Sequence, residues 1–466
     1  MNEFTTTEPY RVGFSTVDIT PPIGMNVRLG GYLRIWKTVK QVYEPLFARA
    51  ICFRHPSEPS KSILIMSVDL VGFQYRMAKI ARRVISNVTG IPIAQIMMHF
   101  THGHTSPDMI GIFPNAISHM VNTDVQYPVL RHILRQLVHA GKTAFASATE
   151  KCKIGFGFSK KPTKPFAVQR RPPHEQFLDP FRIIKITNEQ DKILAVLVNY
   201  QGHPTQLPQS NSNIYPEYPG AIAKALNTKI PGLQYGAYFN GAIGDVSVVG
   251  YRGYHHAINQ GKSHEDAMHF AIENIQKMGN DIVDYVIEAL PQIPTRPLTH
   301  ISATRRFLLP KVGRIRPIRD RMKFYHGLKS KLFLLWKEFK NALRVGALLY
   351  GYEIMNGRPL AMLNVRRTKM GTFHQTELYI FKFNDIFWFS SPGEPFSIYQ
   401  KKLFAKVPQQ KAFMNCMAND TCGYIFPWSF HIQEGYETSF SFDMLFGEYL
   451  YKTFSQELTK LLSKST

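Results

Sequence analysis

The chain has 466 residues, 44% of them apolar, so it can bury a large core and does not belong to the disordered proteins. Its 56 Lys and Arg residues against 33 Asp and Glu residues give a net charge of +23, which favours an anionic partner such as a lipid surface. No RNP, C2H2 or basic-zipper pattern accompanies this charge, so nucleic acid is not favoured as a partner.

Four cysteines, Cys52, Cys152, Cys416 and Cys422, form neither a dense disulfide framework nor a Cys-x2-Cys metal pattern. This usage favours a reducing compartment. The first residues carry no signal-peptide pattern, and no window reaches the roughly 18 apolar residues that a bilayer span needs. We therefore expect a cytoplasmic or peripheral membrane protein, with unconventional export as the other route.

Strand and helix patterns alternate early in the chain and end in a histidine-rich turn. The predicted strands cover residues 12–20, 46–53, 62–71 and 96–100, and apolar residues at helical spacing predict a helix over 76–88. The last of these strands runs into Thr101-His102-Gly103-His104, and Gly103 and Pro107 stop it. His102 and His104 therefore lie at the C-terminal edge of a strand, where open α/β sheets bind their ligands.

Neutral imidazole is the commonest protein ligand for zinc. If the strand continued through the turn, its two-residue period would point His102 and His104 to the same face, where one ion can contact both. The pattern therefore predicts half of a metal site. Such pairs also occur as hydrogen-bonded histidines at strand ends, and this alternative remains open.

The same design returns later in the chain. The further predicted elements are a helix over 128–148, strands over 154–158, 181–187, 193–200 and 234–240, and helices over 221–226 and 265–290. The strand over 193–200 runs into Gln201-Gly202-His203-Pro204, so an apolar strand again delivers a histidine beside glycine and proline. Two strands that deliver histidines in the same manner favour the metal site.

Two loops follow that carry less specific signals. The loop from Gly241 to Ser247 consists mostly of small residues and could place the Ser247 hydroxyl and backbone N–H groups against a ligand. Such loops are also common as structural turns, and this alternative remains open. Residues 291–297 contain several prolines and are expected to form a linker.

The last third of the chain contains a basic segment and a third strand end. Residues 314–345 predict a basic helix with an apolar, aromatic face, which lies either on the protein core or in the interface of an anionic membrane. A hairpin is predicted over 379–390, and its second strand ends in Pro392-Gly393-Glu394, which adds a carboxylate. A helix over 442–462 closes the chain, and no internal repeat or dividing linker is present.

Taken together, these motifs resemble the catalytic domain of the neutral, non-lysosomal ceramidase family. The resemblance runs from Val17-Asp18-Ile19-Thr20-Pro21 to Tyr436-Glu437 and keeps the order of the family's short motifs. It implies an α/β fold in which a large central mixed β-sheet is flanked by helices and carries a metal site at strand ends. It also implies a single catalytic domain over residues 1–466, with a basic helical insertion at about 312–346.

The resemblance further implies a zinc ion held by four side chains. The first histidine of the family's T-H-T-H-S-G-P motif matches His102, and the histidine of its strand-end H-P matches His203. The glutamate of its P-G-E matches Glu394, and the tyrosine of its Y-I-T matches Tyr424. Zn²⁺ is thus the expected cofactor, and a lipid is the expected substrate.

Further roles follow from the same resemblance. His104 matches a second histidine beside the zinc, Arg171 matches an arginine that contacts substrate, and Ser247 matches a serine assigned as nucleophile. In one mechanism, zinc-activated water attacks the amide carbonyl while His104 and Tyr424 stabilise the oxyanion or transfer a proton. In the other, Ser247 attacks and forms an acyl-enzyme. The first is favoured because no general base for Ser247 is evident in its own loop.

The sequence also departs from the family. The family's T-H-T-H-S-G-P-G-G is here T-H-G-H-T-S-P-D, its G-D-V-S-P is G-D-V-S-V, and its immunoglobulin-like C-terminal domain has no counterpart. These departures fall on the pocket more than on the ligands.

The expected function is a zinc-dependent hydrolase that cleaves the amide bond of ceramide or a related N-acyl lipid into a fatty acid and a sphingosine-like amine. The alternatives are a catalytically inactive lipid- or membrane-binding protein of the same fold, and a metal hydrolase of another amide or ester.

Overall fold

The computed structural model describes residues 2–32, 38–110, 126–171, 176–177, 179–249, 253–311, 365–368, 371–430, 437, 441 and 443–463. The basic helix predicted over 314–345 lies outside these residues, so its two alternatives both stay predictions. The division of the chain into one domain with an insertion at about 312–346 also stays a prediction.

Most of the described strands belong to three five-stranded sheets. The first sheet has the order β5 (Ile96–Phe100), β4 (Ile63–Val68), β3 (Phe47–Arg54), β2 (Arg11–Asp18) and β6 (Glu150–Lys151). The second has the order β12 (Tyr235–Asn240), β11 (Ile193–Tyr200), β10 (Arg182–Thr187), β7 (Lys153–Phe158) and β14 (Arg296–Pro297). The third has the order β1 (Asn2–Thr5), β15 (His300–Leu308), β18 (Thr376–Phe383), β19 (Ile386–Ser390) and β21 (Ala412–Asn415).

Shorter strands and seven α-helices complete the described part of the chain. The short strands are β13 (Val246–Val248), β8 (Ala167–Gln169), β9 (Gln176–Phe177), β16 (Val365–Thr368), β17 (Gly371–His374), β20 (Glu394–Pro395) and β22 (Tyr424–Ile425). The helices are α1 (Tyr75–Thr89), α3 (Tyr127–Ala146), α4 (Glu217–Lys229), α5 (Gly253–Asn259), α6 (His264–Ala289), α9 (Ser397–Phe404) and α11 (Phe446–Ser463). Single 3-10 turns lie at Ile23–Met25, Pro59–Lys61, Ile93–Gln95, Leu290–Gln292 and Pro408–Gln410.

Each of the three sheets ends in one parallel pair, and these parallel edges meet. The pairs are β4 with β5, β11 with β12, and β19 with β21; the other pairings within the three sheets are antiparallel. Asn240 at the end of β12 accepts a hydrogen bond from Cys416 N (3.0 Å) and donates its own N–H to His99 Nε2 on β5 (3.2 Å). The three edges are therefore joined by hydrogen bonds at the centre of the molecule.

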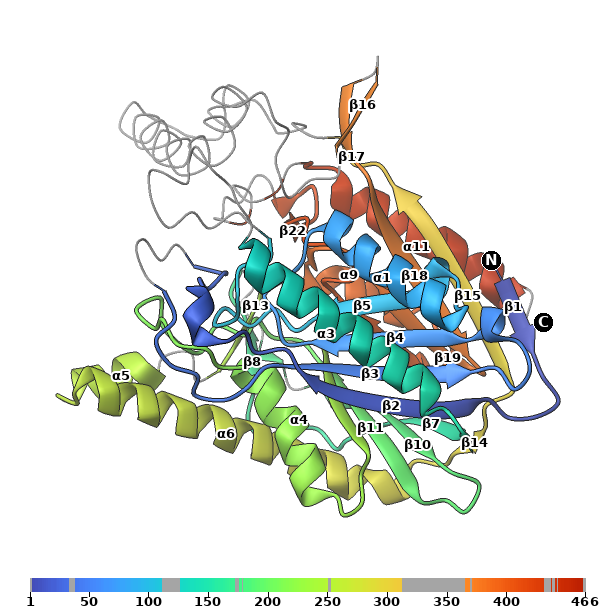
Figure 1. Cartoon of the computed structure of the whole chain (residues 1–466), viewed down its shortest axis with the longest axis horizontal. Helices are drawn as coiled ribbons and strands as arrows, with labels where there is room; N and C mark the ends of the chain where they lie inside the picture. The colour runs from blue at the N-terminus through green and yellow to red at the C-terminus, as the bar shows by residue number, and fades with distance from the viewer. Residues whose placement is uncertain are drawn as a thin grey trace.

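Helices cover the outer faces of the sheets, and a shared core fills the space between them (Figure 1). Helices α1 and α3 lie over the first sheet, α4 and α6 over the second, and α9 and α11 over the third. The central core combines apolar side chains of all three sheets, such as Phe53 of β3, Leu197 of β11 and Trp388 of β19. Because each sheet is covered on one face by helices and on the other by its neighbours, inner strands such as β4, β11 and β19 are almost continuously apolar.

The mixed α/β class with flanking helices is confirmed, and its strands are divided among three packed sheets instead of being joined in one. The strands predicted over 96–100 and 193–200 have the expected bounds. The linker predicted over 291–297 is wrong, because Arg296–Pro297 pairs with β7 as an edge strand. Proline is compatible with that position because an edge strand leaves one row of N–H groups unpaired.

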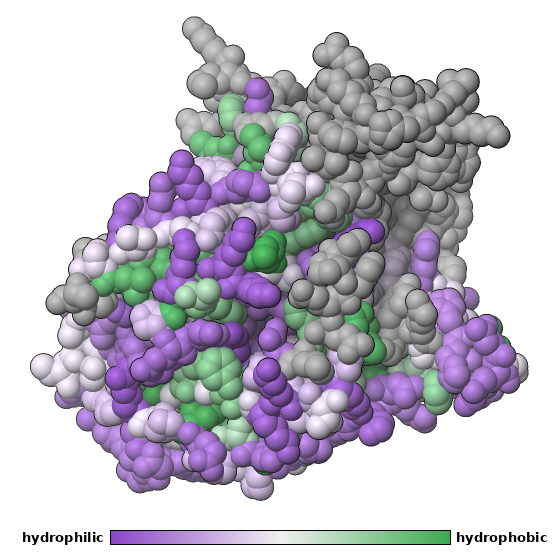
Figure 2. Space-filling view, turned by 180° about the vertical axis from the view of Figure 1, so that it is seen from behind, coloured by the Kyte–Doolittle hydropathy of each residue, from purple (hydrophilic) through white to green (hydrophobic). Residues whose placement is uncertain are grey.

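No helix within the described ranges combines the length and the apolar character that crossing a bilayer requires. The four cysteines are all buried free thiols. Seen from behind, the molecule presents mainly hydrophilic side chains, with hydrophobic residues in small groups between them (Figure 2).

Candidate metal centre

The three sheets each deliver a candidate ligand to one point. His102 and His104 follow β5 of the first sheet, His203 follows β11 of the second, and Glu394 follows β19 of the third. All four side chains are buried. Because these strands belong to the parallel edges that meet at the centre, the turns after their C-terminal ends converge there.

The backbone conformation of the turn after β5 differs from the extended strand end that was predicted. His102 has a left-handed backbone (φ 65°), so the strand does not continue through it. Its N–H donates to Leu70 O (2.9 Å), and the N–H of His104 donates to Pro204 O (3.3 Å) beside His203. The expectation that a two-residue strand period brings His102 and His104 to the same face is therefore wrong. The two rings meet, with centroids 5.0 Å apart, because the chain bends between them.

The tautomer of His102 is set by its own turn. Its Nδ1 lies 2.5 Å from Val71 O, an oxygen that can only accept, so Nδ1 carries the proton. The lone pair of Nε2 then points to the centre of the cluster, 3.5 Å from Glu394 Oε2. A ring nitrogen held by a backbone carbonyl while the other faces inward is the usual arrangement of a metal-binding histidine.

The separations between the inward-facing atoms fit a small ion. His104 Nε2 lies 3.4 Å from His102 Nε2 and 3.1 Å from His203 Nε2, and Glu394 Oε2 lies 3.5 Å from His102 Nε2. His203 faces Glu394 Oε2 with its other nitrogen, Nδ1, at 3.7 Å. Tetrahedral zinc with bonds of about 2.05 Å separates its ligands by about 3.3 Å. Among the described residues, no group donates a hydrogen bond to the buried Glu394 Oε2. Nitrogen and carboxylate donors at these distances fit Zn²⁺.

The protonation of His203 also suits a ligand. Burial lowers the pKa of this histidine well below its usual value, and the nearby charges of His102, Arg170 and His104 lower it further. His203 is therefore neutral at neutral pH and keeps a lone pair available. Its ring lies 4.7 Å from that of His102, with Nε2 3.1 Å from His104 Nε2 and Nδ1 3.7 Å from Glu394 Oε2.

Tyr424, the fourth ligand implied by the resemblance, lies at the edge of the cluster. Its strand β22 pairs in parallel with β20, which puts it directly opposite Glu394 in the register. Its ring stacks on that of His203 at 6.3 Å with an interplanar angle of 23°. The guanidinium of Arg170 lies 5.7 Å from the centre of the same ring. Tyr424 thus lies between the histidines and a positive charge.

Two arginines form the rim of the site with one buried carboxylate. Arg170 Nε and Arg171 Nε each donate to Glu437 Oε1 at 3.0 Å, and a second nitrogen of Arg171 pairs with Glu437 Oε2. Arg170 also donates to Gly244 O at 2.5 Å. Arg171, expected to contact substrate, remains 22% exposed at this rim. The sequence analysis predicted only Arg171 as a site residue. In the structure, the adjacent Arg170 is the arginine that lies over the ring of Tyr424.

Ser247 lies beside the cluster without a base. It forms an isolated parallel bridge with His203, and the N–H of His203 donates to Val246 O (3.0 Å). Its hydroxyl has no hydrogen-bond partner among the described residues. The preceding Asp245 is engaged elsewhere, since its carboxylate accepts from Ser397 N (2.7 Å) and Ser397 Oγ (2.9 Å).

Gly31 and Tyr32, which the sequence analysis did not predict as site residues, contact His104. The Tyr32 ring makes an edge contact with the His104 ring at 4.7 Å. Gly31 has φ 84°, and a Cβ at this position would lie 2.3 Å from His104 Cγ. A side chain at residue 31 would therefore displace the imidazole. The only sequence signal was the pair Gly30-Gly31 that follows the first strand.

A second group of metal-capable residues is fully enclosed. His374, Asp420 and Cys422 bring one donor atom each within 4.8 Å of the others, and His374 Nε2 lies 2.7 Å from Asp420 Oδ2. Structural zinc sites have four protein ligands, and catalytic ones have three and an open position. With three donors and no exposed atom, this group matches neither kind.

Comparison with solved structures identifies proteins with a similar fold. No protein family and no curated protein matches the chain by sequence. Among solved structures, neutral ceramidase from Pseudomonas aeruginosa superposes with a TM-score of 0.69 at 14% identity, covering 96% of this chain and 74% of that one. A structure described as ceramidase complexed with C2 gives a TM-score of 0.67, again at 14% identity and with the same coverage. The chain therefore has a neutral-ceramidase-like fold.

Proposed function

We propose that the chain is a zinc-dependent hydrolase that cleaves the amide bond of ceramide or a related N-acyl lipid. The observation that carries the proposal is the convergence of His102, His104, His203 and Glu394 from three sheets, with 3.1 to 3.5 Å between the Nε2 atoms of neighbouring histidines and between His102 Nε2 and Glu394 Oε2. The ceramidase-like fold supports the same activity, since this fold is found in proteins described as ceramidases. Identity of 14% leaves the choice of N-acyl lipid to experiment.

His102, His203 and Glu394 would hold the ion together with Tyr424, and the position of His104 Nε2 also allows it to bind. Bound zinc would supply a Lewis acid that polarises the amide carbonyl and lowers the pKa of water. Neutral His203 and the fixed tautomer of His102 keep these lone pairs directed to one point. Arg170 would orient Tyr424 by its position over the ring.

Attack by water is favoured over attack by Ser247. A serine nucleophile needs a base within hydrogen-bond reach. No described residue accepts a hydrogen bond from Ser247 Oγ. Arg171 would contribute to substrate binding from the rim, where it is exposed enough to contact a polar group of the lipid.

The test combines elemental analysis with a turnover assay. We expect about one zinc per chain and hydrolysis of a fluorescent short-chain ceramide that stops on chelation and returns when zinc is added. Zinc without ceramide hydrolysis would move the substrate to another N-acyl amide or ester. A chain that holds no metal after purification in zinc, and does not hydrolyse the lipid, would contradict the proposal.

A further inference from the structure

Helices α1 and α3 form a surface without acidic residues, called here the α1–α3 face. The two helices pack side by side over the first sheet (Figure 1). Neither contains Asp or Glu, while three Lys or Arg residues of α1, apart from the buried Arg82, and three of α3 lie on the surface side. Within the described part of the chain, no carboxylate pairs with the exposed Arg83, Arg131 or Arg135. The charges of these three arginines are therefore not neutralised by a described carboxylate.

The same face exposes aliphatic side chains in a regular stripe. Ile80, Val84 and Val88 of α1 are 46%, 40% and 52% exposed. Their spacing of four residues aligns them along one side of the helix. Tyr127 at the start of α3 is 61% exposed. Isolated exposed aliphatic residues are ordinary, but a row of them beside unpaired arginines is typical of helices that lie in a membrane interface.

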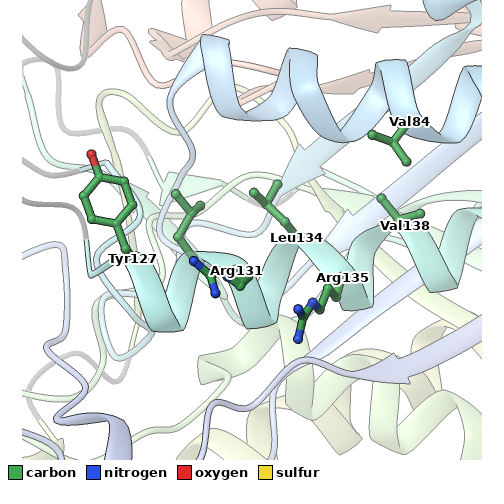
Figure 3. A pocket seen from close by; sticks show the side chains of 7 residues that line it. Val84, Tyr127, Arg131, Leu134, Arg135 and Val138 are labelled. Atoms are coloured by element: carbon green, nitrogen blue, oxygen red, sulfur yellow. The ribbon is translucent and has the colours of Figure 1, made fainter.

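An apolar groove runs between the two helices. It has a volume of about 480 Å³ and is lined by Val84 of α1 and by Leu130, Leu134 and Val138 of α3. Figure 3 shows Val84 and Val138 pointing towards each other across the groove, with Arg131 and Arg135 projecting from α3 beside it. The groove thus combines an apolar floor with cationic side chains at its margin.

Helix α6 has the opposite charge character, whereas the short helix α9 also lacks acidic residues and carries two lysines. The long helix α6 carries six acidic residues and a single lysine. Its carboxylates also neutralise lysines of neighbouring elements, as in the pairs of Asp281 with Lys164 (3.1 Å) and of Asp284 with Lys229 (2.7 Å). Positive charge is therefore not left unneutralised uniformly over the surface, and the α1–α3 face is distinguished by combining such charge with exposed aliphatic side chains and a groove.

One end of the face, the start of α3, is linked to the histidine turn of the candidate metal centre. The side chain of Gln126, which precedes α3, accepts from Arg28 N (2.8 Å) and donates to Arg28 O (3.1 Å). The same Arg28 O accepts from Asp108 N (2.9 Å), in the turn that follows His104. The start of α3 is therefore tied to the histidine turn through one backbone segment.

We propose that the α1–α3 face docks on an anionic membrane surface, with the row of Ile80, Val84 and Val88 among the lipid chains and the arginines on lipid phosphates. Charge complementarity favours this occupant. A symmetric contact with a second copy would instead bring two positive faces together. The proposal involves described helices and not the segment 314–345. It does not depend on the hydrolase activity, because docking is measured without turnover.

The first test is flotation with vesicles of phosphatidylcholine, with and without phosphatidylserine. We expect the wild-type protein to bind the anionic vesicles only. Each Lys or Arg near such a surface contributes about fivefold in affinity. The double variant Arg131→Glu/Arg135→Glu should therefore bind more than about 25-fold more weakly. The matched control, Lys401→Glu/Lys402→Glu, reverses two exposed charges on α9, which packs with α11 away from this face.

The second test reports insertion directly and does not depend on any other basic segment. The four native cysteines are buried, so Val88→Cys provides an accessible thiol for an environment-sensitive dye. We expect a blue shift on anionic vesicles, and none for Ile258→Cys on α5, whose side chain is similarly exposed (37%). Unchanged dye emission, equal binding by both charge-reversal variants, or a dimer that Val84→Asp dissociates would each overturn the proposal. Thermal unfolding verifies that the variants fold.

Discussion

Two buried polar clusters lie on opposite ends of strand β5 and its neighbours, and they differ in how their charges are balanced. In the arginine cluster, Arg82 of α1 pairs with Glu377 Oε1 of β18 (2.5 Å) and donates to Tyr379 OH (2.5 Å). Tyr379 OH in turn donates to Glu377 Oε1 (2.9 Å), and Asn419 donates to the same oxygen (3.4 Å). In the histidine cluster, three histidines and Glu394 face one another, with no arginine or lysine among them.

The difference separates a structural network from a candidate site. Removing a charge from water costs several kcal/mol, and the arginine cluster offsets that cost with its own counter-charges. The histidine cluster lacks a counter-charge of this kind among its four members, so the bound cation proposed above would complete it. A buried charge that is paired with an opposite charge indicates a structural role. Buried side chains whose lone pairs converge without such a partner indicate a ligand-binding site.

The largest expected effect comes from removing a ligand. In His102→Ala, the cluster loses the nitrogen that faces Glu394, so we expect the zinc content to fall below one per chain. Hydrolysis of the short-chain ceramide should fall by more than about 100-fold, which is the loss expected for a residue that only supports a metal ligand. Elemental analysis and initial rates measure both. His256→Ala, at an exposed position on α5, is the control. If the variant kept both zinc and turnover, the cluster would belong with the structural networks.

The arginine cluster should respond in the opposite way. Glu377→Gln leaves the Arg82 charge buried without its partner, so the free energy of unfolding should fall by about 3 to 5 kcal/mol while the zinc content stays the same. Denaturant unfolding gives the value. In the double variant Arg82→Met/Glu377→Gln the loss should be smaller than the sum of the single losses, because the unpaired charge is gone. Additive losses, or lost zinc, would contradict this assignment.

A smaller effect is expected where the chain supports the histidine cluster. In Gly31→Ala, the new methyl group overlaps the His104 ring, so activity should fall by about 10- to 100-fold. Gly261→Ala is the matched control, because its φ of 80° is equally left-handed and nothing lies within 4 Å of the added Cβ. Gly261→Ala should lose about 1 kcal/mol of stability from its left-handed backbone alone, and Gly31→Ala should lose more because of the overlap, as measured by thermal unfolding. Equal activity in the two would show that His104 tolerates the shift.

The smallest effect concerns His99, a buried histidine whose two ring nitrogens both have hydrogen-bond partners. Its Nδ1 donates to Cys416 O (2.8 Å) and its Nε2 accepts from Asn240 N, and burial lowers its pKa to about 3. Between about pH 6.5 and 3 the unfolded chain binds the extra proton, so stability falls as the pH is lowered through this window.

From pH 7 to 5 this histidine should contribute about 2 kcal/mol of lost stability. His99→Gln cannot be protonated in this range. Its unfolding free energy should therefore be lower at pH 7 but change less on acidification than that of the wild type. Parallel pH profiles for the two proteins would show that His99 does not carry the effect.

The sequence predicted the local parts of the site well. Continuous apolar runs determined the strands at Ile96–Phe100 and Ile193–Tyr200, and glycine and proline marked the turns that carry His102 and His203. These signals are local because burial on both faces and chain reversal are recorded within a few neighbouring residues. The strand at His300–Leu308 was missed, and the linker over 291–297 was predicted where an edge strand forms.

Other features depend on residues far apart in the chain. The left-handed backbone of His102, which brings its ring to that of His104, follows from a hydrogen bond to Leu70 O, and no local pattern encodes it. The overlap of Arg170 with Tyr424, and the sharing of Glu437 by Arg170 and Arg171, likewise require strands from different sheets to meet.

By itself, the sequence determined which residues have the chemistry of a metal site and that each follows an apolar strand. The tertiary structure decided that three sheets present their parallel edges to one centre, that α1 and α3 leave an acid-free face beside it, and that Arg82 is neutralised by Glu377. The physical reason is that strand formation and turns depend on neighbouring residues, whereas the balance of buried charge depends on which distant side chains packing brings together.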